Sequence, residues 1–262
     1  MSGSVEREER LLLGQDESRY GEHRLESLAG GRIAVTLSVG GDKASPSRRF
    51  KGRQDQLNED AVYVAAEGDQ VVLFCADAHY GLESSHVLAR LTRDKIGALL
   101  GPTALDLGEV CRAMELDAPE PQTPSETTLL LARLDRVRRE VESISYGDSR
   151  LAALGPSGLR LLGRENHRFV TAGTGRLLSP PAPVRATLAE DELLLAFTDG
   201  IHECHYRHPE TSVAERDFVE LYRRHGADPV AFARALTELA LAGVRGAPGG
   251  QDNIALIVVG PG

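Results

Sequence analysis

Residues 71–77 read Val71-Val72-Leu73-Phe74-Cys75-Ala76-Asp77, six apolar residues followed by a carboxylate. An apolar run without alternation is typical of a strand that is buried on both faces of its sheet. The run at 193–197 has the same form and leads to Asp199, and Asp252 precedes a third run at 254–259. A carboxylate at the end of a buried strand is costly to desolvate unless a cation or hydrogen-bond donors compensate. Several such carboxylates at one sheet edge make an oxygen site suited to magnesium or manganese.

Further strands and helices are predicted around these runs. Strands are expected at 32–38, 61–66, 127–134, 141–146, 150–154 and 159–162, and helices at 82–100, 105–116, 213–225 and 229–242. Because the strands come in groups and do not alternate strictly with helices, we expect an α+β protein with antiparallel sheets and helices packed outside. Order is expected to begin at Arg32. Residues 1–30 are therefore predicted to form a polar N-terminal tail, and residues 31–262 a single domain.

Composition excludes several classes of protein. The chain carries 30 Lys and Arg against 39 Asp and Glu, a formal net charge of −9, which argues against nucleic-acid binding. Its three cysteines are too few and too scattered for a disulfide scaffold or a cysteine zinc site. No apolar run approaches the roughly 20 residues that cross a bilayer, and the charged start lacks the apolar core of a secretory signal. We expect a cytoplasmic protein that binds neither nucleic acid nor membrane; its oligomeric state stays open.

Six short motifs occur in a fixed order along the chain. They are Asn58-Glu59-Asp60-Ala61, Ala76-Asp77-Ala78-His79-Tyr80-Gly81, Ser125-Glu126-Thr127-Thr128, Tyr146-Gly147-Asp148-Ser149-Arg150, Phe197-Thr198-Asp199-Gly200-Ile201 and Gly250-Gln251-Asp252-Asn253-Ile254. This ordered set resembles the metal-dependent serine/threonine phosphatase family, protein phosphatase type 2C, from about Arg32 to Val259. The resemblance implies two packed antiparallel β-sheets flanked by helices, an α-β-β-α sandwich. It also implies hydrolysis of phosphoserine or phosphothreonine on a protein substrate by a hydroxide that bridges two metal ions, Mn²⁺ or Mg²⁺.

The resemblance also assigns metal ligands. Asp77 looks like the carboxylate that bridges the two ions, and Asp199 and Asp252 look like the remaining ligands of one of them. The backbone carbonyl of Ala78 is expected to face the other ion. Glu59 and Asp60 are expected to hold the waters that this second ion coordinates.

Two further roles follow from the same resemblance. Asp148 matches a third, weaker metal position that some family members use, so that two or three ions are expected. His79 matches the general acid that protonates the leaving alkoxide. No cysteine lies in a nucleophile motif, as expected for hydrolysis without a covalent phospho-enzyme.

Three positions depart from the family pattern. Ala78 replaces a glycine, which keeps the ligand carbonyl but disfavours a positive φ. Asp55 replaces an arginine; Arg53, two residues earlier, either binds the substrate phosphate in its place or merely solvates a basic loop. Glu126 replaces a glycine before Thr127 and Thr128, which are expected to begin a core strand. The departures leave a second hypothesis open, a degenerate phosphatase-fold module that binds a phosphoprotein or signalling partner without turnover.

The interval between Asp148 and Asp199 is short and lacks the Thr-x-Asp-His-Ser segment of phosphatases that oppose protein kinases. This compact layout is similar to that of bacterial stress-response and sporulation phosphatases. Substrate selection is therefore expected to fall to surface loops or to a dedicated partner.

Overall fold

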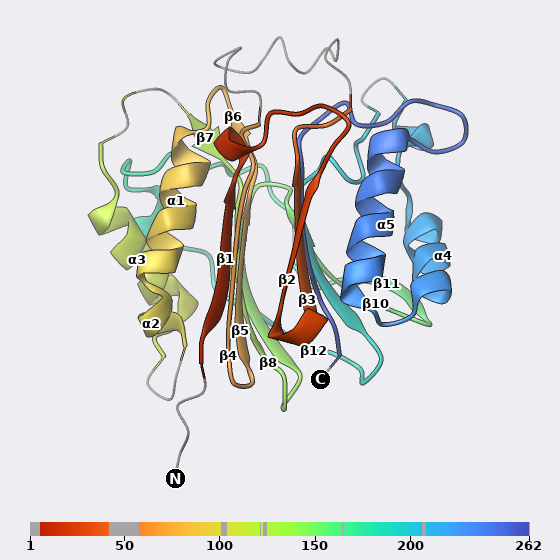
Figure 1. Ribbon diagram of the computed structural model, residues 1–262. Coiled ribbons are helices and arrows are strands. Elements are labelled where there is room, and N and C mark those ends of the chain that lie inside the picture. The colour runs from red at the N-terminus through yellow and green to blue at the C-terminus, as the bar shows by residue number, and fades with distance from the viewer. Residues whose placement is uncertain are drawn as a thin grey trace.

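Two six-stranded antiparallel sheets pack face to face, with helices on both outer faces (Figure 1). The computed structural model describes residues 6–41, 58–100, 104–120, 122, 125–163, 165–205 and 208–261. The layer order is α-β-β-α, as the resemblance implies. None of the helices in these ranges is both long and apolar enough to cross a bilayer.

The first sheet has the strand order β1-β4-β5-β8-β9-β12. Its strands are β1 (Glu8–Leu13), β4 (Ala61–Glu67), β5 (Gln70–Ala76), β8 (Leu129–Asp135), β9 (Glu140–Tyr146) and β12 (Val184–Thr187). Its outer face is covered by α1 (Glu83–Asp94), α2 (Ile96–Leu99) and α3 (Leu107–Asp117). An Asp106–Glu109 capping box begins α3, with the Glu109 N–H donating to Asp106 Oδ1 over 2.8 Å.

The second sheet has the order β11-β10-β13-β14-β3-β2. Its strands are β2 (Arg24–Leu28), β3 (Ile33–Ser38), β10 (Arg150–Gly155), β11 (Gly158–Leu161), β13 (Leu193–Phe197) and β14 (Ile254–Val259). Helices α4 (Glu215–His225) and α5 (Pro229–Ala242) cover its outer face. Asp228 caps α5 by accepting from the N–H groups of Val230 and Ala231, and Pro229 occupies its first position.

Three apolar layers hold the four structural layers together. One lies between the sheets and contains Leu37, Leu73 and Ile257; the others lie between each sheet and its helices. The sequence of β5 does not alternate between apolar and polar residues because both faces of the strand are buried. Leu73 and Cys75 face the inter-sheet core, whereas Phe74 and Ala76 face the helices.

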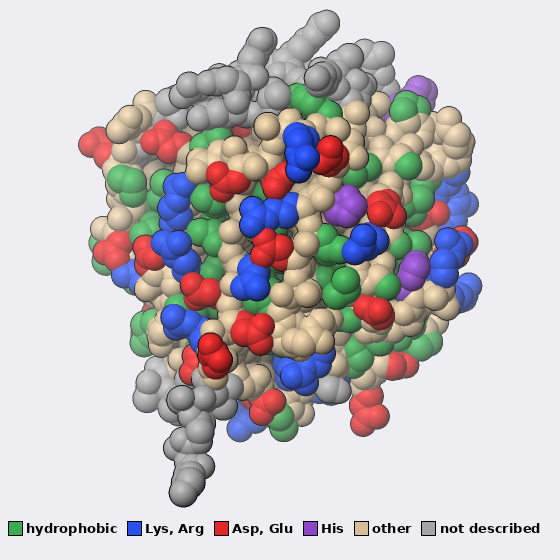
Figure 2. Space-filling view, in the orientation of Figure 1, with side chains coloured by type: hydrophobic (Ala, Val, Ile, Leu, Met, Phe, Trp, Pro, Cys, Tyr) green, Lys and Arg blue, Asp and Glu red, His purple; other side chains and the backbone are tan. Residues whose placement is uncertain are grey.

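The N-terminal region corrects the expectation of a polar tail. β1 and β2, both within residues 1–30, are edge strands of the two sheets. Leu12 and Leu28 are buried, while Arg10 and Glu26 form an ion pair of 2.7 Å (Nε–Oε2). An edge strand with one solvated side carries few apolar residues, so its sequence signal is weak. Acidic and basic side chains are interspersed over the face that carries these two strands (Figure 2).

Two local differences from the predicted elements matter for the site. The helix expected at 82–100 is divided at Lys95, so that Ile96 and Leu99 of α2 turn into the apolar layer under α1. A small extra sheet pairs β6 (Ala78–His79), which follows the Ala76 end of β5, with β7 (Glu126–Thr127). Short 3₁₀ turns occupy Gly14–Asp16, Ala29–Gly31, Arg176–Leu178 and Pro209–Thr211.

Candidate metal centre

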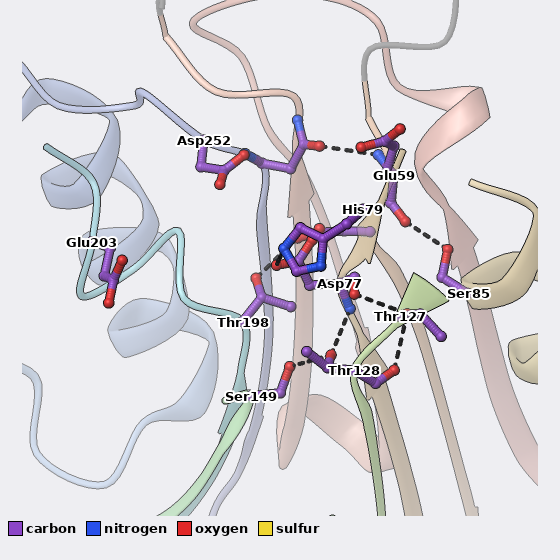
Figure 3. Close-up of polar contacts among 12 residues, drawn as sticks. Glu59, Asp77, His79, Ser85, Thr127, Thr128, Ser149, Thr198, Glu203 and Asp252 are labelled. Atoms are coloured by element: carbon purple, nitrogen blue, oxygen red, sulfur yellow. Dashed lines mark hydrogen bonds and ion pairs between the residues drawn. The ribbon is translucent and has the colours of Figure 1, made fainter. Parts of the chain in front are cut away.

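Strand register gathers the acidic residues at one end of the sandwich. In the first sheet Ala61 pairs with Ala76, so Asp60 and Asp77 stand opposite each other just beyond the paired strands. In the second sheet Phe197 pairs with Leu256, which puts Asp199 beside the start of β14 and close to Asp252. Glu59 and Ser85 lie on the α1 side of this end, and Glu203 and Asp252 lie on the opposite side (Figure 3).

These carboxylates lie close together and out of solvent. Asp60, Asp77, Asp199 and Asp252 are all buried. Burial raises the pKa of Asp199 well above its usual range, and the negative charges of Asp77, Asp252, Asp148 and Glu203 raise it further, in that order. Asp77 and Asp252 are 175 positions apart in the sequence, yet both affect the pKa of Asp199. Strand pairing within the two sheets brings these residues together.

Thr198 links the two sheets at the site. Its Oγ1 donates to Asp60 Oδ2 (2.9 Å) and accepts from the N–H of Ala255 (3.0 Å), while its own N–H donates to the Ala255 carbonyl (3.1 Å). This hydroxyl therefore fixes one Asp60 oxygen relative to β13 and β14. Sequence reasoning missed Thr198, although it directly precedes Asp199.

Thr127 and Thr128 hold the backbone of Asp77. The N–H of Asp77 donates to Thr128 Oγ1 (2.8 Å), and the Asp77 carbonyl accepts from Thr128 N–H (2.8 Å) and Thr127 Oγ1 (2.9 Å). Thr128 Oγ1 is also 2.7 Å from Ser149 Oγ, next to Asp148. Both threonines are fully buried and lie in or beside β7 and β8, so they serve as scaffold, as the sequence predicts.

Asn253 connects Glu59 with Asp252. Its Oδ1 accepts from the N–H of Glu59 (3.0 Å), its Nδ2 donates to the Val39 carbonyl (3.1 Å), and its N–H donates to Asp252 Oδ1 (2.8 Å). Ser85 of α1 donates to the Glu59 carbonyl (2.6 Å). Asn253 follows Asp252 in the motif, but its cross-sheet role depends on the folded arrangement.

Glu203 is an acidic member of the cluster that the sequence analysis did not assign. Its N–H donates to the Asp199 carbonyl (2.7 Å). Partial burial raises the pKa of Glu203, and the charge of Asp148 is the next largest cause. Asp148, which is half-buried, and Glu203, which is exposed, therefore form the outer part of the site.

The short strand β6, which closely follows β5, places His79 at the open side of the site. Its side chain is 38% exposed, and its Nε2 lies 3.9 Å from Asp77 Oδ2. Ala78 is buried and extended in β6, so the alanine at a family glycine position introduces no positive φ. The positive φ occurs two residues later, at Tyr80 (φ 65°). Arg53 lies outside the described residues.

The donor set fits hard divalent cations. Asp148 Oδ1 and Asp199 Oδ1 are buried oxygens that receive no hydrogen bond within the described ranges. Carboxylate and carbonyl oxygens are the ligands that magnesium and manganese prefer. Across those same ranges, no three acidic, histidine or cysteine side chains are yet close enough to hold one ion.

Gly200 shows how closely this end is packed. A Cβ at Gly200 would overlap the Asn253 carbonyl oxygen and lie 2.8 Å from its carbonyl carbon. We expect Gly200→Ala to lower the free energy of unfolding by about 1–3 kcal/mol through overpacking. Gly97→Ala is the matched control, because a Cβ at Gly97 in α2 meets nothing within 4 Å. Urea unfolding measures both; equal stability of the two variants would contradict the close contact.

A buried histidine, His86, and a largely buried one, His202, predict that acid lowers the stability of the fold. Burial lowers the pKa of His202 to about 3, assisted by Arg150, and burial lowers that of His86 to about 4. A histidine with a lowered native pKa contributes stability that is lost as the pH falls below its unfolded value of about 6.5. Between pH 6.5 and 5, we expect His202 alone to remove about 2 kcal/mol of unfolding free energy.

Urea unfolding of wild type and His202→Leu across this pH range tests that loss. The substitution should flatten the pH dependence, whereas His167→Gln, at an exposed histidine, should leave it unchanged. Parallel pH curves for wild type and His202→Leu would contradict the prediction.

Comparison with known proteins agrees with this geometry. The model of the SpoIIE family (Stage II sporulation protein E) matches residues 83–261. No curated protein matches the chain. Among solved structures, the S. agalactiae serine/threonine phosphatase superposes with a TM-score of 0.62 at 14% identity, covering 88% of this chain and 99% of that one.

Two further structures show the same likeness. The catalytic domain of the serine/threonine protein phosphatase PstP, in complex with two manganese ions, has a TM-score of 0.60 at 20% identity and covers 87% of this chain and 97% of that one. The phosphatase MsPP from Mycobacterium smegmatis, in complex with cacodylate, has a TM-score of 0.59 at 18% identity and covers 88% of this chain and 98% of that one. The fold is that of the bacterial PP2C-type serine/threonine phosphatases. Within that class, the chain belongs to the SpoIIE family.

Proposed function

We propose that this protein is a metal-dependent phosphatase that hydrolyses phosphoserine or phosphothreonine on a protein substrate. The observation that carries the proposal is the convergence of Asp77, Asp148, Asp199 and Asp252 at one end of the sandwich, around a buried carboxyl with a raised pKa. Two Mn²⁺ or Mg²⁺ ions, bound here, would supply a nucleophile at neutral pH and neutralise the substrate phosphate.

The chain's own residues divide this work. The carboxylate of Asp77 would contribute to holding both ions, Asp199 and Asp252 would complete the ligands of one, and the Ala78 carbonyl would serve the other. Glu59 and Asp60 would hold coordinated waters, and Thr198 already fixes one oxygen of Asp60. Asp148, joined by Glu203, would hold a third ion at the outer position.

His79 is proposed to act as the general acid. Its partly exposed ring can approach the leaving oxygen, whereas the carboxylates behind it are buried. As the P–O bond to the serine or threonine oxygen breaks, a proton from the protonated imidazole neutralises the developing alkoxide, and the product leaves as an alcohol.

Phosphate release from a phosphoserine or phosphothreonine peptide tests the function. We expect turnover with added manganese and none above background with a chelator. Asp252→Asn should fall to the chelator rate, and Asp191→Asn, an exposed position before β13, should retain wild-type turnover. Background rates for wild type with manganese would exclude catalysis.

The second candidate function is a phosphatase-fold module that binds a phosphoprotein or signalling partner without turnover. The observation that favours it is that, within the described ranges, no three acidic, histidine or cysteine side chains are placed to hold one ion together. The alanine at position 78 was one reason for this second hypothesis, since alanine disfavours a positive φ. Ala78 is extended and has no positive φ, so that reason no longer applies. Calorimetric titration with manganese separates the two: binding at two sites supports the enzyme, and no binding supports the module.

A further inference from the structure

His79 has an aromatic neighbour that comes from a distant part of the chain. The ring of Phe169 lies 5.0 Å from the ring of His79, centroid to centroid, with an interplanar angle of 83°. This T-shaped arrangement is the favoured geometry for an aromatic pair. Phe169 is half-buried, and neither the motifs nor the acidic cluster includes it.

Backbone pairing fixes the position of this neighbour. Thr127 pairs with Ala78 on one side and with Val170 on the other. The Thr127–Val170 bridge has both of its hydrogen bonds, at 2.8 and 2.9 Å. Val170 is fully buried, so the segment that carries Phe169 is anchored through this isolated bridge beside the β6–β7 pair that carries His79.

The contact matters because the other groups recorded beside the His79 ring in the described part of the chain, the Asp77 carboxylate and the Tyr80 ring, restrain it less. Neither ring nitrogen makes a hydrogen bond there, and the 3.9 Å separation from Asp77 Oδ2 exceeds hydrogen-bond distance. General acids are normally oriented by a third group. The second aromatic neighbour, Tyr80, is 6.4 Å away, tilted by 54° and 56% exposed, so it restrains the ring less.

We infer that Phe169 is a positioning residue for His79: its ring holds the imidazole in the rotamer that faces the substrate's leaving oxygen. In this inference Phe169 acts on the reaction through its ring contact with His79. The effect of this orientation on catalysis rests on the proposed function. The orientation of the His79 ring by Phe169 does not, because it can be measured without turnover.

The direct test is made on the metal-free protein. Three-bond NMR couplings to His79 Cγ report the χ1 rotamer population of this side chain. We expect one dominant rotamer in wild type and in Phe169→Tyr, and rotamer averaging in Phe169→Leu, which keeps an apolar side chain without the ring. Averaging in wild type, or one dominant rotamer in Phe169→Leu, would overturn the inference whether or not the protein is a phosphatase.

The second test uses leaving groups of different basicity. A phosphoserine peptide needs a proton on its leaving oxygen, whereas p-nitrophenolate leaves without one. With manganese, we expect Phe169→Leu to lower kcat for the peptide by roughly 2- to 10-fold, the fold-change that corresponds to loss of an aromatic pair. For p-nitrophenyl phosphate, kcat should stay within about twofold, because the general acid is dispensable for that substrate.

Control variants keep the two proposals separate. His79→Gln should show the same substrate dependence with a larger loss, and Phe169→Tyr should restore the peptide rate. Leu161→Ala, which truncates an exposed leucine in the distant strand β11, should affect neither substrate. Equal losses on both substrates in Phe169→Leu would refute a role through His79. Inactivity of wild type on both substrates would instead refute the proposed function, and the rotamer measurement would still decide the inference.

Discussion

Replacing Asp199 by asparagine is expected to abolish metal-dependent turnover and, at neutral pH, to stabilise the metal-free fold. Burial and the negative charges of four neighbouring acids oppose the ionisation of Asp199. Among the proposed ligands, this effect is clearest at Asp199. Removal of the charge relieves that repulsion, which should raise the free energy of unfolding by about 1–3 kcal/mol. Loss of even an outer-shell partner lowers metal affinity or activity about 10–100-fold, so removal of a ligand should lower kcat/KM by more than about 100-fold.

This opposition between stability and activity distinguishes a ligand from a structural residue. Urea unfolding without metal and phosphate release with manganese measure the two effects on the same preparation. Asp191→Asn makes the same chemical change on the surface and should alter neither quantity. A destabilised Asp199→Asn protein would show that the carboxylate is structural, and full activity would exclude it as a ligand.

Manganese is expected to raise the melting temperature of wild type by about 5–10 °C at a free concentration 100 times its Kd. Binding to the folded state alone stabilises it by about 2.7 kcal/mol at that concentration, and each kcal/mol is about 2–4 °C for a chain of this size. Asp199→Asn and Asp252→Asn should lose most of the shift. Scanning calorimetry with manganese and with a chelator provides the measurement.

The pH dependence of the metal-free protein has a definite sign. Because the pKa of Asp199 is raised in the folded state, its contribution to stability is fully present below the unfolded value of about 3.9 and is lost as the pH rises through the native pKa. The stability advantage of Asp199→Asn over wild type should therefore grow as the pH rises from 4 towards neutrality. A constant difference between the two proteins would contradict the buried, repelled carboxylate.

Most of the fold could be predicted because its signals are local. The apolar runs of β5, β13 and β14 have no polar face, and this alone indicates strands covered on both sides. The edge strands β1 and β2 were missed for the opposite reason. Their pairing depends on the sheet already being present, and their sequence mixes exposed charges such as Arg10 and Glu26 with a few buried leucines.

The candidate site was predicted only in part. Asp77, Asp199 and Asp252 are visible in sequence because each adjoins an apolar run. Thr198 and Asn253 are adjacent to such aspartates, yet their roles depend on partners in the other sheet, Asp60 and Glu59. The Thr198–Asp60 contact joins residues 138 positions apart, and the Asn253–Glu59 contact joins residues 194 positions apart. A single sequence carries no signal for such pairs.

The sequence by itself determined which residue types are available: oxygen donors at the ends of buried strands, a histidine two positions after one of them, and no cysteine placed for nucleophilic attack. Tertiary structure alone decided their neighbours. Antiparallel register places Asp60 opposite Asp77 and Asp199 beside β14, and the Thr127–Val170 bridge brings Phe169 to His79. The physical reason is that hydrophobic periodicity specifies which face of a strand is buried, whereas pairing between distant strands specifies which polar side chains share an edge.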